Sequence, residues 1–149
     1  MMVQDKISLS ESDAVMSQAE NGRQTCVLLA EDDRALRRFL EIVLERAGYQ
    51  VIPASDGLEA MKLVLSTPID VVVTDAMMPN LSGHEFCRFL RSSPALAQLP
   101  IILLTALERK DTNRGAEQAD AFLSKPVSGE SLVECIEELL TRTSKLKDS

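Results

Sequence analysis

Apolar and polar positions form two alternating patterns along the chain after residue 24. Short apolar runs of strand length alternate with longer segments in which apolar residues recur every three or four positions, the spacing of one helix face. The runs predicted as strands are residues 25–30, 49–54, 69–75, 100–106 and 119–125. In the third run, valines 71–73 are consecutive, which is typical of a strand covered on both faces. Five strand–helix repeats predict an α/β fold, a parallel sheet with helices on both faces.

Helix start and stop signals flank the longer segments. An Asp precedes the helix predicted from Arg34, and Gly48 follows it. Residues 82–85 read SGHE, the S-x-x-E form of a capping box, and Ser128 caps the last predicted helix. The predicted apolar faces are Leu36, Phe39, Leu40, Val43 and Ala47; Leu58, Met61, Val64 and Leu65; Phe86 and Leu90; and Leu132, Ile136, Leu139 and Leu140. A helix is also expected between Leu107 and Gln118, with a poor apolar face.

The same patterning divides the 149 residues into three parts. Residues 1–24 are polar and are interpreted as a mobile N-terminal extension, with docking on a partner as the alternative. Residues 25–142 form one domain, which is long enough to bury a core. Residues 143–149 form a short charged C-terminal tail.

Composition and charge exclude several functional classes. The net charge of −7 repels a phosphate backbone, and with 3% aromatics and no Trp the chain has few stacking surfaces, so we expect no nucleic-acid binding. No apolar run approaches the roughly 20 residues of a membrane span, and the N-terminus lacks a secretion signal. Three widely spaced cysteines predict reduced thiols, with Cys26 buried in a strand. A cytoplasmic protein is therefore expected.

Polar residues follow four of the five predicted strands. Glu31 and Asp32 follow the first, Asp75 ends the third, Thr105 ends the fourth and Lys125 ends the fifth. Singly, each is most simply a helix cap, a turn residue or a surface lysine. Together they indicate a site, because functional groups of parallel sheets gather at the carboxyl ends of the strands. Convergent carboxylates repel one another, and a hard cation such as Mg²⁺ would remove that repulsion.

The chain resembles the receiver domains of two-component response regulators. The matching stretches are LLAEDD at 28–33, DGLEA at 56–60, VVVTDAMMPNLSG at 71–83, LLTA at 103–106 and FLSKP at 122–126. The resemblance covers nearly all of the predicted domain. It implies a flavodoxin-like (βα)5 fold with a doubly wound parallel five-stranded sheet in the order 2-1-3-4-5.

The resemblance also implies the roles of individual residues. Asp75 is the phosphoacceptor, a carboxylate nucleophile that forms an aspartyl phosphate. Asp32, Asp75 and the main-chain carbonyl of Met77 are direct Mg²⁺ ligands, and Glu31 acts through a water molecule. Lys125 stabilises the charge of the phosphoryl group.

Two further residues are expected to convert phosphorylation into a signal. The resemblance implies that Thr105 donates a hydrogen bond to the phosphoryl group and moves toward it. Phe122 then swings inward as an aromatic switch and changes the surface around the fifth strand. Without the resemblance, Phe122 is more simply a core residue and Thr105 a strand residue with a satisfied hydroxyl. His84 is expected to be exposed and to have no metal-binding role.

The predicted function is that of a response regulator receiver. It is phosphorylated by a sensor histidine kinase or histidine phosphotransfer protein and signals to an unknown protein target, with no nucleic acid or membrane, as a monomer or weak dimer. It is no enzyme beyond its own phosphorylation and dephosphorylation.

Two alternatives remain open. An aspartyl-phosphate-forming phosphohydrolase would carry a second acid where this chain has Met77. A degenerate receiver would act as a constitutive interaction domain.

One segment departs from the family pattern. Residues 107–118 are slightly short, and Gln118 stands where the family has a glycine before the fifth strand. A shortened or irregular fourth helix is therefore predicted, with consequences for partner choice. Only a short charged stretch follows Arg142, which favours a stand-alone receiver and leaves a receiver excised from a longer chain as the alternative.

Overall fold

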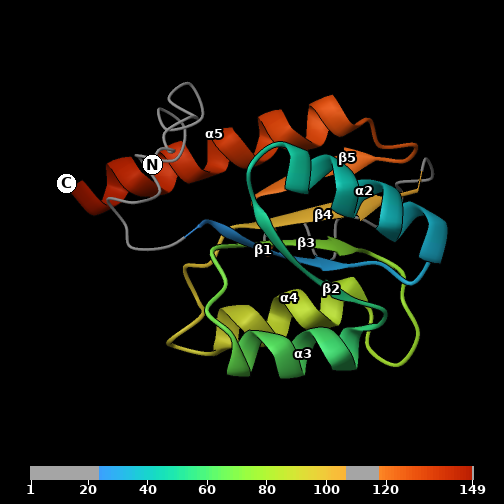
Figure 1. Ribbon diagram of the computed structural model, residues 1–149. Coiled ribbons are helices and arrows are strands. Elements are labelled where there is room, and N and C mark those ends of the chain that lie inside the picture. The colour runs from blue at the N-terminus through green and yellow to red at the C-terminus, as the bar shows by residue number, and fades with distance from the viewer. Residues whose placement is uncertain (1–23, 107–117, 149) are drawn as a thin grey trace, which may run out of the picture.

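The computed structural model of the protein describes residues 24–106 and 118–148, and Figure 1 shows the arrangement of their elements. The strands are β1 (Cys26–Ala30), β2 (Gln50–Ala54), β3 (Val71–Asp75), β4 (Ile101–Thr105) and β5 (Ala121–Ser124). The helices are α2 (Arg34–Arg46), α3 (Gly57–Ser66), α4 (Gly83–Ser92) and α5 (Gly129–Asp148). All five predicted strands are confirmed, as are the four helices predicted within the described residues.

The five strands form one parallel sheet in the order β2-β1-β3-β4-β5, as the resemblance implied. The strands pair so that their carboxyl ends lie at one edge. Ala30 is opposite Thr74, Asp75 is opposite Leu104, and Thr105 is opposite Ser124. The polar residues that follow these strands are therefore brought to one edge by the register of the sheet.

Helices cover both faces of the sheet. Val27 and Leu29 of β1 belong to the core on the side of α2 and α5, whereas Leu28 and Ala30 belong to the core on the side of α3 and α4. Figure 1 shows the same division, with α2 and α5 on one side of the sheet and α3 and α4 on the other. Successive strand residues point to opposite faces, so a strand buried on both must be apolar throughout. This explains the consecutive valines of β3.

The predicted helix ends are confirmed by the backbone geometry. Asp33 accepts a hydrogen bond from the Leu36 N–H and begins α2. Gly48, just after α2, has a φ of 101°, which costs a glycine little. At the start of α4, Ser82 and Glu85 form the complete capping box. These local signals set where each helix begins relative to the edge of the sheet.

The apolar face predicted for α3 is partly wrong. The helix buries Gly57, Ala60 and Val64, whereas Leu58 and Leu65 are 45% and 65% exposed. Each leucine directly follows a buried residue and so lies about 100° around the helix from it. Ala60 and Val64 belong to the core on this side of the sheet, whereas Gly57 packs against the main chain of Leu81. Phe39 shares the apolar spacing of α2 but is likewise exposed at its surface.

Three further predictions concern the ends and connections of the chain. α5 continues to Asp148, beyond Arg142, where the sequence pattern ends the domain. The predicted extension at 1–24, apart from Gln24, and the helix predicted between Leu107 and Gln118, apart from Gln118 itself, fall outside the described residues. Within the described ranges, no helix combines the length and apolar character that crossing a bilayer requires.

Candidate functional site

Three carboxylates meet at the carboxyl edge of the sheet. Glu31 and Asp32 follow β1 directly, and Asp75 is the last residue of β3, the neighbouring strand. One oxygen from each of the three lies within 4.8 Å of the others. Glu31 and Asp75 are buried and Asp32 is exposed, so the group opens to solvent on the Asp32 side.

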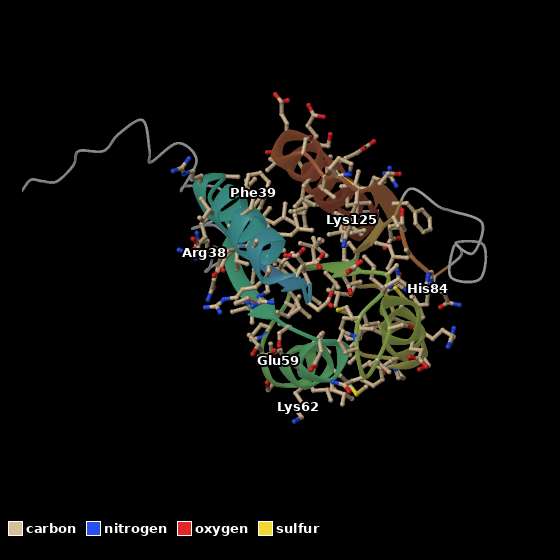
Figure 2. All side chains as sticks on the ribbon, turned by 90° about the vertical axis from the view of Figure 1, so that its right-hand side faces the viewer. Arg38, Phe39, Glu59, Lys62, His84 and Lys125 are labelled. Carbon is tan, nitrogen blue, oxygen red and sulfur yellow. The ribbon has the colours of Figure 1, made fainter. Side chains whose placement is uncertain are left out.

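Lys125 reaches this group from the end of β5. Its Nζ lies 3.1 Å from Asp75 Oδ2 and 3.2 Å from Glu31 Oε1. In the view toward the carboxyl ends of the strands, Lys125 lies near the centre of the molecule, whereas Lys62 lies at its periphery (Figure 2). The ammonium therefore bridges the two buried carboxylates.

The proximity of like charges and burial shift the acid–base behaviour of the site. Burial, together with the charge of Asp75, raises the pKa of Glu31 to about 7, against the Asp33 N–H and Lys125, which lower it. Burial lowers the pKa of Lys125, but hydrogen bonding and charge from Asp75 and Glu31 outweigh burial and raise that pKa. The lysine is therefore charged at neutral pH, and it shares its charge between two acids.

Thr105 and Phe122 occupy the neighbouring strands β4 and β5. The Thr105 hydroxyl is buried and has no hydrogen-bond partner among the described residues. A buried hydroxyl without a partner is costly, and it is well suited to a ligand that brings an acceptor. Phe122 is half-buried and packs against the core on the α3 and α4 side.

The loop after β3 carries the Met77 main chain. The Met77 N–H approaches Asp75 Oδ1 at 3.4 Å, and the Met77 side chain is 70% exposed. The side chain therefore leaves the carboxylates clear. No acidic side chain occupies this position, two residues after Asp75, where a phosphohydrolase would carry its second acid.

His84 differs from expectation. It is half-buried rather than exposed, and its Nδ1 is enclosed without a hydrogen-bond partner in the described part of the chain.

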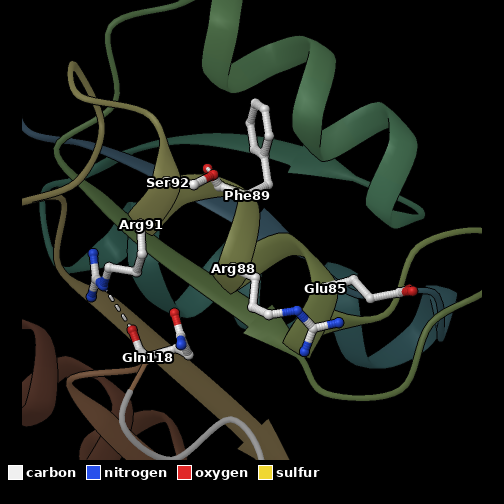
Figure 3. A pocket seen from close by; sticks show the side chains of 6 residues that line it. All are labelled: Glu85, Arg88, Phe89, Arg91, Ser92 and Gln118. Carbon is white, nitrogen blue, oxygen red and sulfur yellow. Dashed lines mark hydrogen bonds between the residues drawn. The ribbon is translucent and has the colours of Figure 1, made fainter.

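A separate surface pocket of about 520 Å³ lies along α4 and includes Arg88, Arg91 and Gln118 (Figure 3). It contains none of the residues predicted for the site.

Sequence reasoning did not identify the residues that support the site. Arg37 of α2 donates a hydrogen bond from Nη1 to the main-chain carbonyl of Glu31 at 2.7 Å. Asn80, in the loop between β3 and α4, donates one to Asp56, the N-cap residue of α3. The DGLEA stretch, which contains Asp56, was recognised only as part of a resemblance. Arg37 binds a main-chain oxygen, and Asn80 binds a side chain 24 residues away in the sequence. No residue pattern in the sequence therefore reveals either contact.

The donor set suits a hard divalent cation. All three acidic groups offer oxygen, which Mg²⁺ prefers, and a single ammonium faces them among the described residues. Asp32 and Asp75 would hold the ion directly, with Glu31 beside them. The buried hydroxyl of Thr105 provides a further polar group at the same edge.

Comparison with known proteins identifies the family. Residues 27–137 match the model of the response regulator receiver domain. Among curated relatives, the response regulator MprA of Mycobacterium sp. (strain KMS) is 42% identical over 120 residues, which is 79% of this chain and 51% of that protein. The transcriptional regulatory protein GltR of Pseudomonas aeruginosa is 39% identical over 124 residues, or 82% of this chain and 50% of that protein. The chain thus spans about half the length of these relatives.

Solved structures of receiver domains are similar in fold. The receiver domain of the Francisella response regulator 1452 has a TM-score of 0.74 and 33% identity, covering 80% of this chain and 98% of that one. The Thermotoga maritima response regulator TrrA, in complex with Mg²⁺ and BeF, has a TM-score of 0.71 and 30% identity, covering 77% of this chain and 98% of that one. The fold, the family match and the acidic edge agree, and the chain belongs to the receiver domains of two-component response regulators.

Proposed function

We propose that this receiver accepts a phosphoryl group on Asp75 in a Mg²⁺-dependent reaction and signals through the resulting change of surface. The observation that carries the proposal is the position of Asp75. Its carboxylate lies within 4.8 Å of two other carboxylates and 3.1 Å from the Lys125 ammonium. A lone structural acid would need neither arrangement.

The transfer begins with a carboxylate oxygen of Asp75. This oxygen forms a bond to phosphorus while the bond from phosphorus to the imidazole nitrogen of a phosphohistidine breaks, and the electron pair of that bond stays on the nitrogen. No general base is needed, because the attacking group carries no proton when it is ionised. The product is an acyl phosphate on Asp75.

The other residues counter the charge of the transferred group. When Asp75 becomes an acyl phosphate, its carboxylate no longer carries the charge that Lys125 pairs with, and the ammonium, still beside Glu31, can bind a phosphoryl oxygen. The Thr105 hydroxyl, which has no partner among the described residues, donates to another oxygen. When bound by Asp32, Asp75 and the Met77 carbonyl, with Glu31 acting through water, Mg²⁺ supplies the remaining positive charge.

Signalling depends on the link between the site and the surface. Movement of Thr105 toward the phosphoryl group opens space beside β4, and the half-buried Phe122 on β5 moves into it. This shifts the population between two surfaces, and the shift is limited by how much the phosphoryl group favours one of them. The donor is a sensor histidine kinase or phosphotransfer protein in the cytoplasm. The target of this receiver domain is a protein.

Labelling with a small-molecule donor tests the proposal. We expect acetyl phosphate with Mg²⁺ to add one phosphoryl group, seen by intact-protein mass spectrometry, and EDTA to prevent the addition. Asp75→Asn should block it because an amide is not a nucleophile toward phosphorus. Glu134→Gln, an exposed acid on α5, removes the same charge elsewhere and should be labelled normally.

Three outcomes would contradict this assignment. Unchanged labelling of Asp75→Asn would remove Asp75 from its role, and failure of the wild-type chain to accept a phosphoryl group would support the degenerate receiver. Many turnovers on small phosphomonoesters would instead support a phosphohydrolase.

A further inference from the structure

The Met77 loop, residues 76–82 between β3 and α4, contains the predicted main-chain ligand. It is closed at its base by a 3.0 Å hydrogen bond from the Gly83 N–H to the Ala76 carbonyl. A Cβ on Gly83 would lie 2.1 Å from the Asp75 carbonyl oxygen, so the backbone of Gly83 packs directly on the phosphoacceptor. The base of the loop is therefore held beside the site by the backbone itself.

The tip of the loop is held from a different element. The Asn80 side chain donates a 3.1 Å hydrogen bond from Nδ2 to Oδ2 of Asp56, the residue that caps α3. Asn80 has a φ of 73°, a conformation that asparagine adopts more readily than most residues. A Cβ on Gly57 would lie 2.0 Å from the Leu81 carbonyl oxygen, so only glycine allows α3 to approach the loop this closely.

Asp56 performs two tasks with its two oxygens. Oδ1 accepts the Glu59 N–H at 2.8 Å and begins α3, while Oδ2 holds Asn80. The hydrogen bond from the Glu59 N–H lowers the pKa of Asp56 and outweighs the opposing effect of desolvation, and the hydrogen bond from Asn80 lowers this pKa further. The contact to Asn80 is therefore a hydrogen bond to a charged group, the stronger kind.

We propose that Asp56 and Asn80 are a positioning pair that holds the Met77 loop in the conformation required for Mg²⁺ binding. The inference rests on the proposed function, in which the Met77 carbonyl is a metal ligand. Mg²⁺ demands nearly ideal octahedral geometry, so a carbonyl on an untethered loop must be ordered each time the ion binds. Mutation of a residue that orients a metal ligand without touching the ion commonly lowers metal affinity about 10- to 100-fold. Here the effect acts through a loop, and it makes Mg²⁺ affinity depend on the start of α3.

Asn80→Gly is the direct test because it removes the amide, keeps the positive φ and leaves the charge unchanged. We expect isothermal titration calorimetry on the full chain to show a Mg²⁺ dissociation constant about 10-fold higher, at the lower end of the usual range because the backbone at the base of the loop still holds the carbonyl. The midpoint of thermal unfolding in EDTA should change by only a few degrees. At saturating Mg²⁺ the rate of phosphorylation by acetyl phosphate should return to near the wild-type value. Asp56→Ser keeps a cap for α3 but cannot reach Asn80, and should weaken Mg²⁺ binding similarly.

Exchanging the two residues separates positioning from general loosening. The double variant Asp56→Asn with Asn80→Asp restores an amide–carboxylate hydrogen bond at the same net charge, and we expect it to recover most of the lost affinity. Unchanged Mg²⁺ affinity in Asn80→Gly would overturn the inference while leaving the proposed function intact. So would an affinity loss that the exchange does not reverse. If the wild-type chain fails to bind Mg²⁺, the proposed function and this inference fall together.

Discussion

Glu31 is the residue whose behaviour departs furthest from that of an ordinary surface acid. It has no exposed surface and lies beside two other carboxylates, those of Asp75 and Asp32. The Lys125 ammonium pairs with Glu31 but also with Asp75. Its proton is held more tightly in the folded chain than in the unfolded one, because burial and the negative charge of Asp75 both disfavour ionisation. When these carboxylates are ionised, the repulsion between them reduces the stability of the folded chain.

This raised pKa predicts how stability depends on pH. The folded pKa of about 7 exceeds the ordinary value of 4.5, so Glu31 contributes stability below pH 4.5 and loses that contribution as pH rises through 7. Relative to Glu31→Gln, the wild-type chain in EDTA should lose about 1–2 kcal/mol of unfolding free energy between pH 5 and pH 7.5. Urea unfolding of both proteins at the two pH values measures this. A constant difference between them would show that Glu31 ionises normally.

Lys125 is the single ammonium among the described residues that faces this repulsion. Lys125→Ala should leave the fold largely intact in EDTA, with a loss of about 1–3 kcal/mol in unfolding free energy, because two acids lose a shared partner. Phosphorylation by acetyl phosphate should slow about 10- to 100-fold, since one charge-stabilising group is lost. Lys62→Ala, on the exposed side of α3, should change neither. Global unfolding of Lys125→Ala would assign the lysine a structural role instead.

At the scale of elements, strand positions followed directly from the sequence, whereas helix faces did so only in part. The three central strands, β1, β3 and β4, are buried throughout and consist mainly of apolar residues because the sheet is covered on both sides, and this composition is readable without the structure. The caps of α2 and α4 were equally readable, because capping is local. The face of α3 was not, since Gly57 and Ala60 are buried whereas Leu58 and Leu65 are exposed.

One arginine side chain connects α4 to the segments that directly precede β4 and β5. Arg91, in the last turn of α4, donates to the carbonyls of Ala97, Leu99 and Gln118 and pairs with Asp120 at 2.8 Å. The same Asp120 oxygen accepts the Ile101 N–H, so it joins the start of β4 to the start of β5. Figure 3 shows Arg91 reaching across to Gln118. The fork of a guanidinium is needed to reach this many acceptors.

Arg91→Lys should therefore not be a conservative change. A lysine ammonium cannot match the fixed fork, so we expect a loss of about 1–3 kcal/mol in unfolding free energy, measured by urea denaturation. Arg88→Lys is the matched control on the same helix, where the side chain is exposed, and should stay within about 0.5 kcal/mol of wild type. Equal effects of the two substitutions would mean that the Arg91 contacts contribute no net stability.

At the scale of the whole molecule, the site is an edge of the sheet rather than a feature of any one element. Its residues come from the ends of β1, β3, β4 and β5, and the parallel register brings those ends together. A cation that binds this edge has no equivalent site in the unfolded chain. Metal binding and global stability are therefore linked.

This linkage predicts that Mg²⁺ stabilises the entire domain. The midpoint of thermal unfolding should rise with Mg²⁺ concentration, with about 2.7 kcal/mol of added stability at 100 times the dissociation constant. Asp32→Asn should abolish most of this rise, because Asp32 is a predicted direct ligand. NaCl at matched ionic strength controls for screening of surface charge. An equal rise in Asp32→Asn would place the Mg²⁺ effect elsewhere on the surface.

The sequence by itself determined the strand and helix order and the candidate residues Glu31, Asp32, Asp75, Thr105 and Lys125. Strand runs and helix caps depend on residues that are near one another in the chain, and so do motifs at strand ends. In a parallel sheet such ends must share an edge, so grouping the candidates required only the fold class.

Only the tertiary structure decided how those groups interact. The sharing of Lys125 between Glu31 and Asp75 and the hydrogen bond between Asn80 and Asp56 join residues from separate segments. The burial of the Thr105 hydroxyl, with no partner in the described part of the chain, likewise follows from packing. Burial and distance set the pKa of Glu31, and neither is a property of the residue or its sequence neighbours. The identities of the site residues were thus readable from local sequence, whereas their ion pairs and pKa values depend on contacts between distant segments.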